Sequence, residues 1–248
     1  MSQTTTSPKI ALVLGATGAV GKAVVKDLLV NEHYTKVVAA GRRHVQLDDS
    51  IPQDKLVQET IDFENLDESR GAFKDVDDVY CCLGTTRKDA GSAEAFRKID
   101  QEYVIESAKM IAQENPATEG VKSKVHFLYC SSVGANANSY FLYPQSKGQT
   151  EERLQQIGFS KVSIFQPGGL VVEEARPRFR PAESFIGLID RVSTALRLNM
   201  TIPVGGAARA MRKAATDTPA FIQPKTHQES GSQVIYYSNR DMLVMNQQ

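Results

Sequence analysis

The stretch over residues 10–30 limits the possible folds of this chain more than any other part of the sequence. It begins with Ile10–Leu14, a short uninterrupted apolar run of the kind found in parallel strands that are covered on both faces. Gly15, Gly18 and Gly21 follow, and the residues after them carry apolar side chains at helical spacing. A strand, a glycine-rich turn and a helix in this order predict the first βα unit of an α/β domain.

The same alternation of apolar runs and amphipathic stretches continues through the first two thirds of the chain. Further strands are predicted over residues 36–40, 56–61, 76–83, 124–130 and 162–166, and helices over 93–113 and 142–157. Strands that alternate with helices predict a doubly wound, mostly parallel sheet with right-handed crossovers, which is a Rossmann-type α/β fold.

The last third has a different pattern and is expected to form a small C-terminal cap. Residues 167–181, rich in Pro, Gly and Arg, predict a loop, and the polar residues 223–232 are expected to be mobile. The other elements predicted here are helices over 183–198, 207–215 and 239–245 and strands over 201–204 and 233–237. We therefore expect a single domain over residues 1–248, in which residues 168–232 cover the substrate.

The charge balance argues against a large electrostatic binding surface. Lys plus Arg and Asp plus Glu both number 29, so no excess charge favours nucleic acid or an anionic membrane. No apolar run approaches the ~20 residues of a transmembrane segment, and the Ser/Thr-rich amino terminus lacks the apolar core of a secretory signal. We expect a cytoplasmic protein whose partners bind in pockets.

The cysteines and histidines give no sign of a disulfide framework or a metal site. Cys81, Cys82 and Cys130 are odd in number, and two of them are adjacent in an apolar run, which predicts reduced, buried thiols. The four histidines are scattered along the chain, without the ligand spacing of a zinc site. No metal is expected.

The glycine-rich turn is the first candidate binding site. Glycine lets the backbone approach a pyrophosphate without a Cβ atom in the way, and the following helix offers free N–H groups to the phosphates. The spacing is Gly-x-x-Gly-x-x-Gly instead of the common Gly-x-Gly-x-x-Gly, and a turn without a ligand is the alternative. The position after the first strand favours a dinucleotide. The predicted contacts are Gly15, Thr17, Gly18, Ala19, Val20 and Gly21.

Two arginines after the second predicted strand indicate which dinucleotide binds. NAD-binding domains commonly place a carboxylate there, where it accepts hydrogen bonds from the adenosine ribose. Arg42 and Arg43 occupy that place here, and guanidinium groups bind a 2′-phosphate through paired, charge-assisted hydrogen bonds. This predicts NADPH, with two solvated loop arginines as the alternative.

The ends of the third and fourth strands are also expected to meet the cofactor. Asp62 can accept a hydrogen bond from the adenine amino group, while the adjacent Phe63 is also a candidate core residue. The fourth strand ends in small residues that let the backbone reach the nicotinamide ribose, although a plain turn has the same composition. The predicted contacts are Asp62, Phe63, Leu83, Gly84, Thr85 and Thr86.

Tyr143 and Lys147 form a Tyr-x-x-x-Lys motif at the start of a predicted helix. Residues four apart share a helix face, so the phenol and the ammonium can point into one site. A free tyrosine titrates near pH ~10, and a nearby ammonium favours the phenolate, which makes the phenol a better acid–base group at neutral pH. Lys147 can also donate to the ribose hydroxyls.

Two serines at the end of the fifth strand complete the candidate catalytic set. Ser132, eleven residues before Tyr143, is the first choice for a donor to the substrate carbonyl oxygen, with Ser131 close behind. Serines cap strand ends routinely, and Tyr-x-x-x-Lys occurs by chance in many helices. The glycine turn, the serines and the Tyr–Lys pair in this order are more specific than any one of them.

These segments together resemble the short-chain dehydrogenase/reductase superfamily, and within its atypical branch the Tat-interacting-protein oxidoreductase family, which has animal members and fungal members assigned to mitochondria. The strings that carry the likeness are Gly41-Arg42-Arg43, Asp62-Phe63, Cys81-Cys82-Leu83-Gly84-Thr85-Thr86-Arg87 and Phe141-Leu142-Tyr143. The resemblance runs from about Lys9 to Met245. It implies an NADPH-bound Rossmann fold with Tyr143 as the proton donor, Lys147 as a ribose ligand, and a mitochondrial location as the alternative to the cytoplasm.

The resemblance also implies cofactor contacts beyond the sixth strand. At two positions this sequence differs from the family pattern. Arg176 or Arg178 would reach the phosphates. Gln166 stands where the family pattern has arginine, and Asp100 lies nearest to the place of an asparagine that many members use in a proton relay. The residues implied to pass beside the nicotinamide are Pro167, Gly168, Gly169 and Leu170.

Two functions are compatible with these observations. The first is an NADPH-dependent reductase of a small carbonyl compound, with Phe179 and Phe185 in an apolar wall over the substrate or simply over the sheet. The second is an NADPH-binding regulatory or sensor protein that acts through a protein partner with little turnover. A kinase or nucleotide hydrolase is excluded, because no Walker-type Lys-Ser/Thr follows the glycines.

Overall fold

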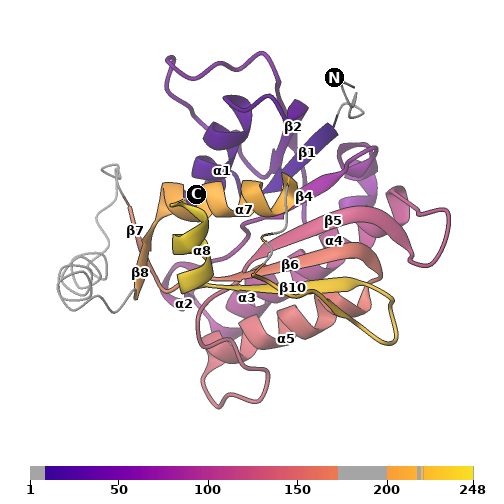
Figure 1. The fold of residues 1–248 in the computed structure, drawn as a ribbon, viewed down its shortest axis with the longest axis vertical. Helices are drawn as coiled ribbons and strands as arrows, with labels where there is room; N and C mark the ends of the chain where they lie inside the picture. The colour runs from indigo at the N-terminus through magenta and orange to yellow at the C-terminus, as the bar shows by residue number, and fades with distance from the viewer. Residues whose placement is uncertain (1–8, 173–199, 217–218, 220, 248) are drawn as a thin grey trace.

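Eight strands form one sheet in the order β3-β2-β1-β4-β5-β6-β10-β9 (Figure 1). The structure, a computed structural model, describes residues 9–172, 200–216, 219 and 221–247. The strands are β1 (Lys9–Leu14), β2 (Tyr34–Gly41), β3 (Leu56–Thr60), β4 (Asp78–Cys81), β5 (Ser123–Cys130), β6 (Phe159–Gln166), β9 (Lys225–Thr226) and β10 (Gln233–Ser238). Neighbouring strands are parallel except β9, which runs antiparallel to β10. The predicted Rossmann-type α/β fold with a mostly parallel sheet is confirmed.

Helices cover both faces of this sheet (Figure 1). On one face lie α1 (Ala19–Leu29), α7 (Val204–Thr216) and α8 (Asn239–Met245), whose buried side chains share one apolar cluster. On the other face lie the 3₁₀ helix η1 (Leu66–Phe73), α4 (Tyr103–Glu114) and α5 (Leu142–Gln156), which contribute to a second cluster. The central strands are largely apolar because each of their faces is buried under one of these clusters.

The long helix predicted over residues 93–113 is interrupted by a wider turn. It divides into α3 (Ala93–Arg97), a π-helical turn η2 (Lys98–Glu102) and α4, and the short helix α2 (Arg87–Ala90) precedes it. The π turn places Asp100 in the interior, where it is fully buried. Single π turns inside α-helices are frequent at functional sites.

The predicted cap differs from the structure in two places. The loop expected over residues 167–181 is wrong at its start, because β7 (Gly169–Val171) pairs in parallel with β8 (Thr201–Pro203) in a separate small sheet. The polar segment over residues 223–232 contains β9, which is paired with β10. The sequence pattern missed both strands because β7 has only three residues and β9 only two.

Helix α7 lies within the region that was expected to cover the substrate, yet it is part of the helical layer over the sheet. Its residues Ala207, Ala210 and Met211 are buried in the same cluster as Val24 and Leu28 of α1. The predicted helix over residues 183–198 and the predicted phosphate ligands at 176 and 178 lie outside the described residues. A substrate-covering role for the rest of residues 168–232 stays a prediction.

The strand at one end of the sheet is very short. β9 has two residues, and one hairpin turn joins it to β10.

Among the described helices, none combines the length and the apolar character that crossing a lipid bilayer requires.

Candidate active site

The predicted site residues follow the carboxyl ends of the parallel strands. The glycine-rich loop follows β1, the two arginines follow β2, and the serines follow β5. Carboxyl ends of parallel strands lie at one edge of a sheet, and in open α/β sheets ligands bind in the crevice outside that edge. The fold therefore brings these segments, which are far apart in sequence, to one side of the molecule.

The glycine-rich loop has room for backbone only. Gly15 has φ +80°, and a Cβ atom there would lie 2.6 Å from the carbonyl oxygen of Cys82. A Cβ atom on Gly21 would lie 2.2 Å from the carbonyl oxygen of Gly15. Both glycines are required for the turn and for the contact with β4, so they are explained by packing as well as by a ligand.

The amino terminus of α1 is open to an anion. Gly18 is the N-cap and supplies no side-chain hydrogen bond, and the first turn of α1 holds no acidic residue. Thr17 and Gly18 are exposed, whereas Val20 is buried in the core beneath the turn. An uncapped helix start with exposed N–H groups and a positive dipole end fits a phosphate.

Arg42 and Arg43 are both exposed after β2. Within the described part of the chain, no carboxylate forms an ion pair with either guanidinium group, so both remain available to a ligand. Asp62, after β3, is exposed and accepts a hydrogen bond from the backbone N–H of Glu64 at 3.0 Å. Phe63 is buried and stacks on Tyr103, which assigns it to the core.

The residues after β4 surround a buried carboxylate. A Cβ atom on Gly84 would lie 3.2 Å from Oδ1 of Asp100 and 3.6 Å from Nζ of Lys147. The backbone N–H of Thr85 donates to Oδ1 of Asp100 at 3.4 Å. Leu83 is packed against the apolar cluster under α4 and α5. Among the predicted contacts that follow β4, Leu83 is therefore the one held by packing.

Lys147 lies at the centre of the site and is almost fully buried. Its ammonium lies 3.4 Å from Oδ1 of Asp100 and donates to the hydroxyl of Tyr129 at 3.0 Å. Burial alone would lower the pKa of Lys147, but Tyr129 and Asp100 outweigh burial and hold it well above its usual value. Burial raises the pKa of Tyr129, which therefore stays a neutral phenol. Lys147 is thus a fixed positive charge.

Tyr143 lies one helical turn before Lys147 on α5 and is 46% exposed. Its ring is 6.2 Å from the ring of Phe96, centroid to centroid, and both line a pocket of about 180 Å³ at this edge of the sheet. The other lining residues are Thr85, Thr86, Arg87 and Leu142. The predicted phenol therefore faces a small, mostly apolar pocket.

The two serines after β5 have different surroundings. Ser131 is buried and donates its hydroxyl hydrogen to Oε1 of Glu151. Gln166 donates to the two carboxylate oxygens of Glu151 at 3.0 and 3.1 Å, and burial raises the pKa of Glu151. Ser132 is less buried and donates to the carbonyl oxygen of Val133 at 3.0 Å, a weak contact that a substrate oxygen can replace.

The segment after β6 is held by close backbone contacts. A Cβ atom on Gly168 would lie 2.1 Å from the carbonyl oxygen of Met200, and Gly169 donates to that oxygen at 2.9 Å. The N–H of Gly168 donates to Oδ1 of Asn239 at 2.8 Å. Pro167 accepts a hydrogen bond from the N–H of Val133. These contacts start β7, which also includes Leu170.

Sequence reasoning missed two members of this site. Tyr129 gave no signal beyond its place in the strand that leads to Ser131, and Glu151 gave only its spacing of one helical turn from Lys147. Asp100 was identified by position, but its ion pair with Lys147 was not expected. All three are buried, and long-range packing alone creates their contacts.

The cysteines are free thiols near this site. Cys81 is buried, and Cys82 and Cys130 are partly buried. Burial raises the pKa of Cys81 to about 12 and that of Cys130 to about 11, so these thiols are not activated nucleophiles. Within the described residues, no group of three or more His, Cys, Asp or Glu side chains is arranged to hold a metal ion.

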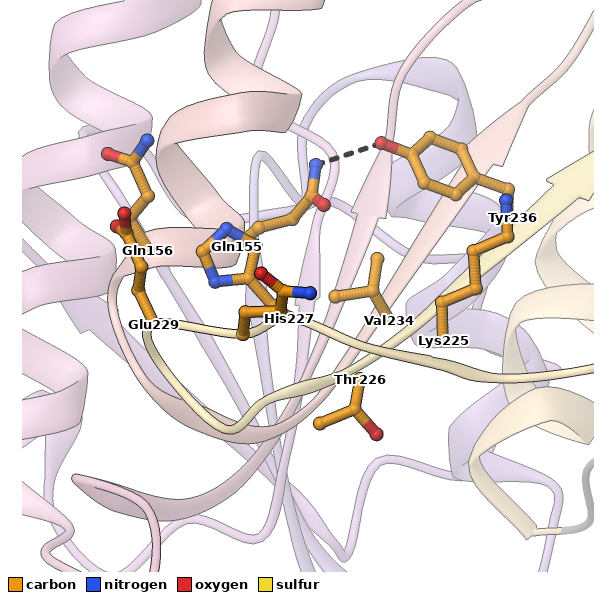
Figure 2. A pocket seen from close by; sticks show the side chains of 9 residues that line it. Gln155, Gln156, Lys225, Thr226, His227, Glu229, Val234 and Tyr236 are labelled. Atoms are coloured by element: carbon orange, nitrogen blue, oxygen red, sulfur yellow. Dashed lines mark hydrogen bonds between the residues drawn. The ribbon is translucent and has the colours of Figure 1, made fainter.

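A larger and more polar pocket, of about 430 Å³, lies at the β9 edge of the sheet. Figure 2 shows it between the end of α5 and the β9–β10 hairpin, with His227 in the middle and the Gln155–Tyr236 hydrogen bond of 2.9 Å at its rim. None of the described residues predicted for the dinucleotide or for catalysis lines it. Volume alone therefore does not identify the active site of this chain.

Comparisons with known proteins agree with this geometry. The model of the NAD(P)H-binding family matches residues 15–184. Protein HTATIP2 of Rattus norvegicus is 36% identical over 205 residues, which cover 82% of this chain and 79% of that protein. The mitochondrial protein fmp52 of Emericella nidulans is 32% identical over 189 residues, 75% of this chain and 78% of that protein. The mitochondrial FMP52 of Candida albicans is 38% identical over 162 residues, which cover 65% of this chain and 67% of that protein.

Solved structures share the fold. A short-chain dehydrogenase/reductase from Saccharomyces cerevisiae has a TM-score of 0.61 at 15% identity and covers 94% of this chain and 96% of its own. The Bordetella bronchiseptica enzyme WbmF, solved in complex with NAD+, has a TM-score of 0.60 at 12% identity. The match covers 96% of this chain and 78% of the WbmF chain. The chain therefore belongs to the NAD(P)H-binding family, has the short-chain dehydrogenase/reductase fold, and is a relative of HTATIP2 and the FMP52 proteins.

Proposed function

We propose that this protein is an NADPH-dependent reductase of a small carbonyl compound. The family and the fold support an oxidoreductase-type role with a nicotinamide cofactor. The observation that carries the finer proposal is the position of Tyr143, which lines a pocket while the buried, charged Lys147 lies one helical turn further along α5. A phenol beside a fixed ammonium is suited to proton transfer.

The residues present fit NADPH. Gly15 and Gly21 allow the tight turn, and the uncapped start of α1 at the exposed Gly18 is suited to a pyrophosphate. Arg42 and Arg43 are exposed and have no carboxylate partner among the described residues, as a 2′-phosphate requires. Asp62 is exposed after β3 and would accept a hydrogen bond from the adenine, and Thr85 and Thr86 lie at the turn after β4.

The chain's own residues divide the reaction between them. When bound, NADPH supplies a hydride to the carbonyl carbon. Tyr143 donates its proton to the carbonyl oxygen, so that the product is an alcohol, and Ser132 donates a hydrogen bond that orients this oxygen. Lys147 stabilises the phenolate that remains on Tyr143, and Asp100 and Tyr129 keep Lys147 in place. A solvent proton then restores the phenol.

The proposal predicts a clear separation of binding from turnover. Tyr143→Phe removes the transferable proton and leaves the glycine loop untouched, so NADPH affinity should stay within about 3-fold while turnover falls by about 100-fold or more. The measurements are NADPH oxidation across aldehydes, ketones and quinones and fluorescence titration of NADPH. Tight NADPH binding with equal turnover in both proteins would remove Tyr143 from the mechanism.

Cofactor choice has its own test. NADPH and NADH differ in the 2′-phosphate, so the double variant Arg42→Gln, Arg43→Gln should lose at least about 10-fold of NADPH affinity and keep its NADH affinity. Lys36→Gln, an exposed cation on β2, is the matched control. An unchanged ratio of the two affinities in the double variant would refute the proposed phosphate site.

A second function is favoured by one feature of the surface. Tyr140 and Phe141, on the loop before α5, are 103% and 78% exposed, and Val133 on the same loop is 63% exposed. Exposed apolar groups of this size suit contact with a protein partner, as a sensor that binds NADPH with little turnover would need. NADPH binding without turnover on any carbonyl probe, together with partner binding that Phe141→Ser abolishes, would favour this function.

The location is a proposal as well. The amino terminus predicts the cytoplasm, whereas the fungal relatives are named mitochondrial. We propose that the chain follows these relatives, and fractionation of cells that express it with a carboxyl-terminal tag decides between the two compartments.

A further inference from the structure

The pocket beside Tyr143 combines apolar walls with one cation. Phe96 and Leu142 form the apolar walls, and the threonines after β4 close one side. Arg87, the first residue of α2, is the only one of the described lining residues with a formal charge. A pocket of this composition suits a ligand that is apolar over most of its surface and negatively charged at one point.

The guanidinium group of Arg87 has no protein partner in the part of the chain that the structure describes. By contrast, Arg70 is paired with Asp67 and Glu114, and Arg212 with Asp27 at 2.6 Å. These two arginines are held by carboxylates, whereas Arg87 forms no ion pair with a described residue.

Two carboxylates of this part of the chain, Asp89 on α2 and Asp100 in the site, are engaged with other groups. Asp89 accepts the hydroxyl hydrogen of Thr86 at 2.9 Å, and Asp100 is paired with Lys147. Arg87 is exposed, and a guanidinium, which is less strongly hydrated than an ammonium, forms paired, charge-assisted hydrogen bonds with a carboxylate. An anion on the substrate would therefore meet a cation that no described residue pairs with.

We propose that Arg87 determines specificity at this site and that the substrate is a small carbonyl compound with a carboxylate, an oxo acid. The proposal rests on the proposed reductase function and deepens it. The volume of about 180 Å³ is below the roughly 300–1,000 Å³ of pockets for drug-sized ligands. A short aliphatic chain or a single ring fits this size, with the carbonyl at Tyr143 and the carboxylate at Arg87.

The experiment uses pairs of compounds that differ in charge and hardly in shape. The pairs are para-carboxybenzaldehyde with para-formylbenzamide, and meta-carboxybenzaldehyde with meta-formylbenzamide. For the wild type, we expect kcat/KM to favour each acid over its amide by about 10-fold or more. Arg87→Gln should reduce this preference to less than about 3-fold by slowing the acids, with the amides unchanged. Arg87→Lys should retain an intermediate preference.

Lys88→Gln is the matched control, because it removes the same charge from the next residue of α2 and does not line the pocket. It should keep the wild-type preference. Calorimetric binding of para-carboxybenzaldehyde and para-formylbenzamide to the NADPH complex repeats the comparison without turnover. Selective binding of the acid that Arg87→Gln abolishes would support the anion site even if the reductase proposal fails.

Two results would overturn the inference. Equal preference for acid and amide in the wild type, in kinetics and in calorimetry, would show that Arg87 does not select an anion on the substrate. A loss of NADPH affinity in Arg87→Gln with an unchanged acid-to-amide ratio would assign the guanidinium to a phosphate of the cofactor instead.

Discussion

At the scale of single residues, the site depends on a buried ion pair. Asp100 and Lys147 are each less than a twentieth exposed, and the second carboxylate oxygen of Asp100 has no hydrogen-bond partner among the described atoms. A buried pair can be costly to desolvate, but removal of one partner leaves an uncompensated charge. The pair therefore fixes the position of Lys147 more than it stabilises the fold.

Lys147→Met should destabilise the cofactor-free protein by about 3 kcal/mol, because Asp100 is left buried and charged. The double variant Asp100→Asn, Lys147→Met removes both charges and should recover a large part of that loss. Urea unfolding of the single and double variants measures this coupling.

Lys124→Met, at an exposed position of β5, serves as the control and should change the free energy of unfolding by less than about 0.5 kcal/mol. If the losses of Lys147→Met and Asp100→Asn, each measured alone, add up to the loss of the double variant, the two residues are not coupled. The ion pair would then have no energetic role in placing Lys147.

At the scale of elements, α5 and the loop before it are joined through a glycine. A Cβ atom on Gly148 would lie 2.2 Å from the backbone nitrogen of Ala137 and 2.4 Å from the carbonyl carbon of Asn136. The N–H of Asn136 donates to the carbonyl oxygen of Pro144 at 2.9 Å. The loop that follows Ser132 is thus packed directly against the helix that carries Tyr143 and Lys147.

Gly148→Ala tests this contact with two opposing effects. Alanine is favoured over glycine inside a helix by about 1 kcal/mol, whereas overpacking against the loop backbone costs about 1–3 kcal/mol. Because neither backbone atom can move far, we expect a net loss of stability in urea unfolding and weaker turnover.

Gly71→Ala is the matched control, since no atom lies within 4 Å of the added Cβ and its φ is not positive. It should leave stability unchanged or slightly raised. A Gly148→Ala protein as stable as the Gly71→Ala protein would show that the loop is not pressed against α5.

At the scale of the whole molecule, a buried polar network ties five strands together at the amino-terminal edge of the sheet. Asp78 of β4 accepts from Tyr34 of β2 at 2.9 Å and from Lys9 of β1 at 3.2 Å. Nδ1 of His126 on β5 lies 3.5 Å from Oδ1 of Asp78, and Nε2 of the same ring forms a hydrogen bond of 2.8 Å with the hydroxyl of Ser163 on β6. This edge lies opposite the candidate active site.

The histidine of this network makes stability depend on pH. Burial lowers the pKa of His126 to about 4 against the attraction of Asp78, so the imidazole is neutral at pH 7. Burial alone would raise the pKa of Asp78, but His126, Lys9 and Tyr34 outweigh it and lower the value. Because His126 is neutral at pH 7, the positive charge paired with Asp78 at this pH is the ammonium of Lys9.

The sign of the effect follows from the histidine. Between pH ~6.5 and ~4 the unfolded chain binds a proton at this residue and the folded chain does not, so stability falls as the pH falls. The expected loss is about 3 kcal/mol. Urea unfolding from pH 7 to pH 4 measures it.

Variants separate this histidine from the other groups that titrate in the same range. His126→Gln should flatten the dependence, and the same change at the exposed His44 should not. A His126→Gln protein with the wild-type slope would rule out His126 as its source.

The sequence by itself determined the local units of this protein. The apolar run of β1, the glycines after it and the helix α1 are adjacent in the chain, so sterics and periodicity predict their conformation without tertiary contacts. The Tyr143–Lys147 spacing on α5 and the end helix over residues 239–245 were predicted for the same reason. The alternation of such units was sufficient to predict the parallel sheet.

Only the tertiary structure decided which distant residues meet. The pairing of β7 with β8, the packing of α7 on α1 and the pairing of Lys147 with Asp100 and Tyr129 each join segments that no local pattern relates. Ser131 became a partner of Glu151 for the same reason. Burial requires every polar group to find a partner, and which partner is within reach depends on the packing of the whole fold.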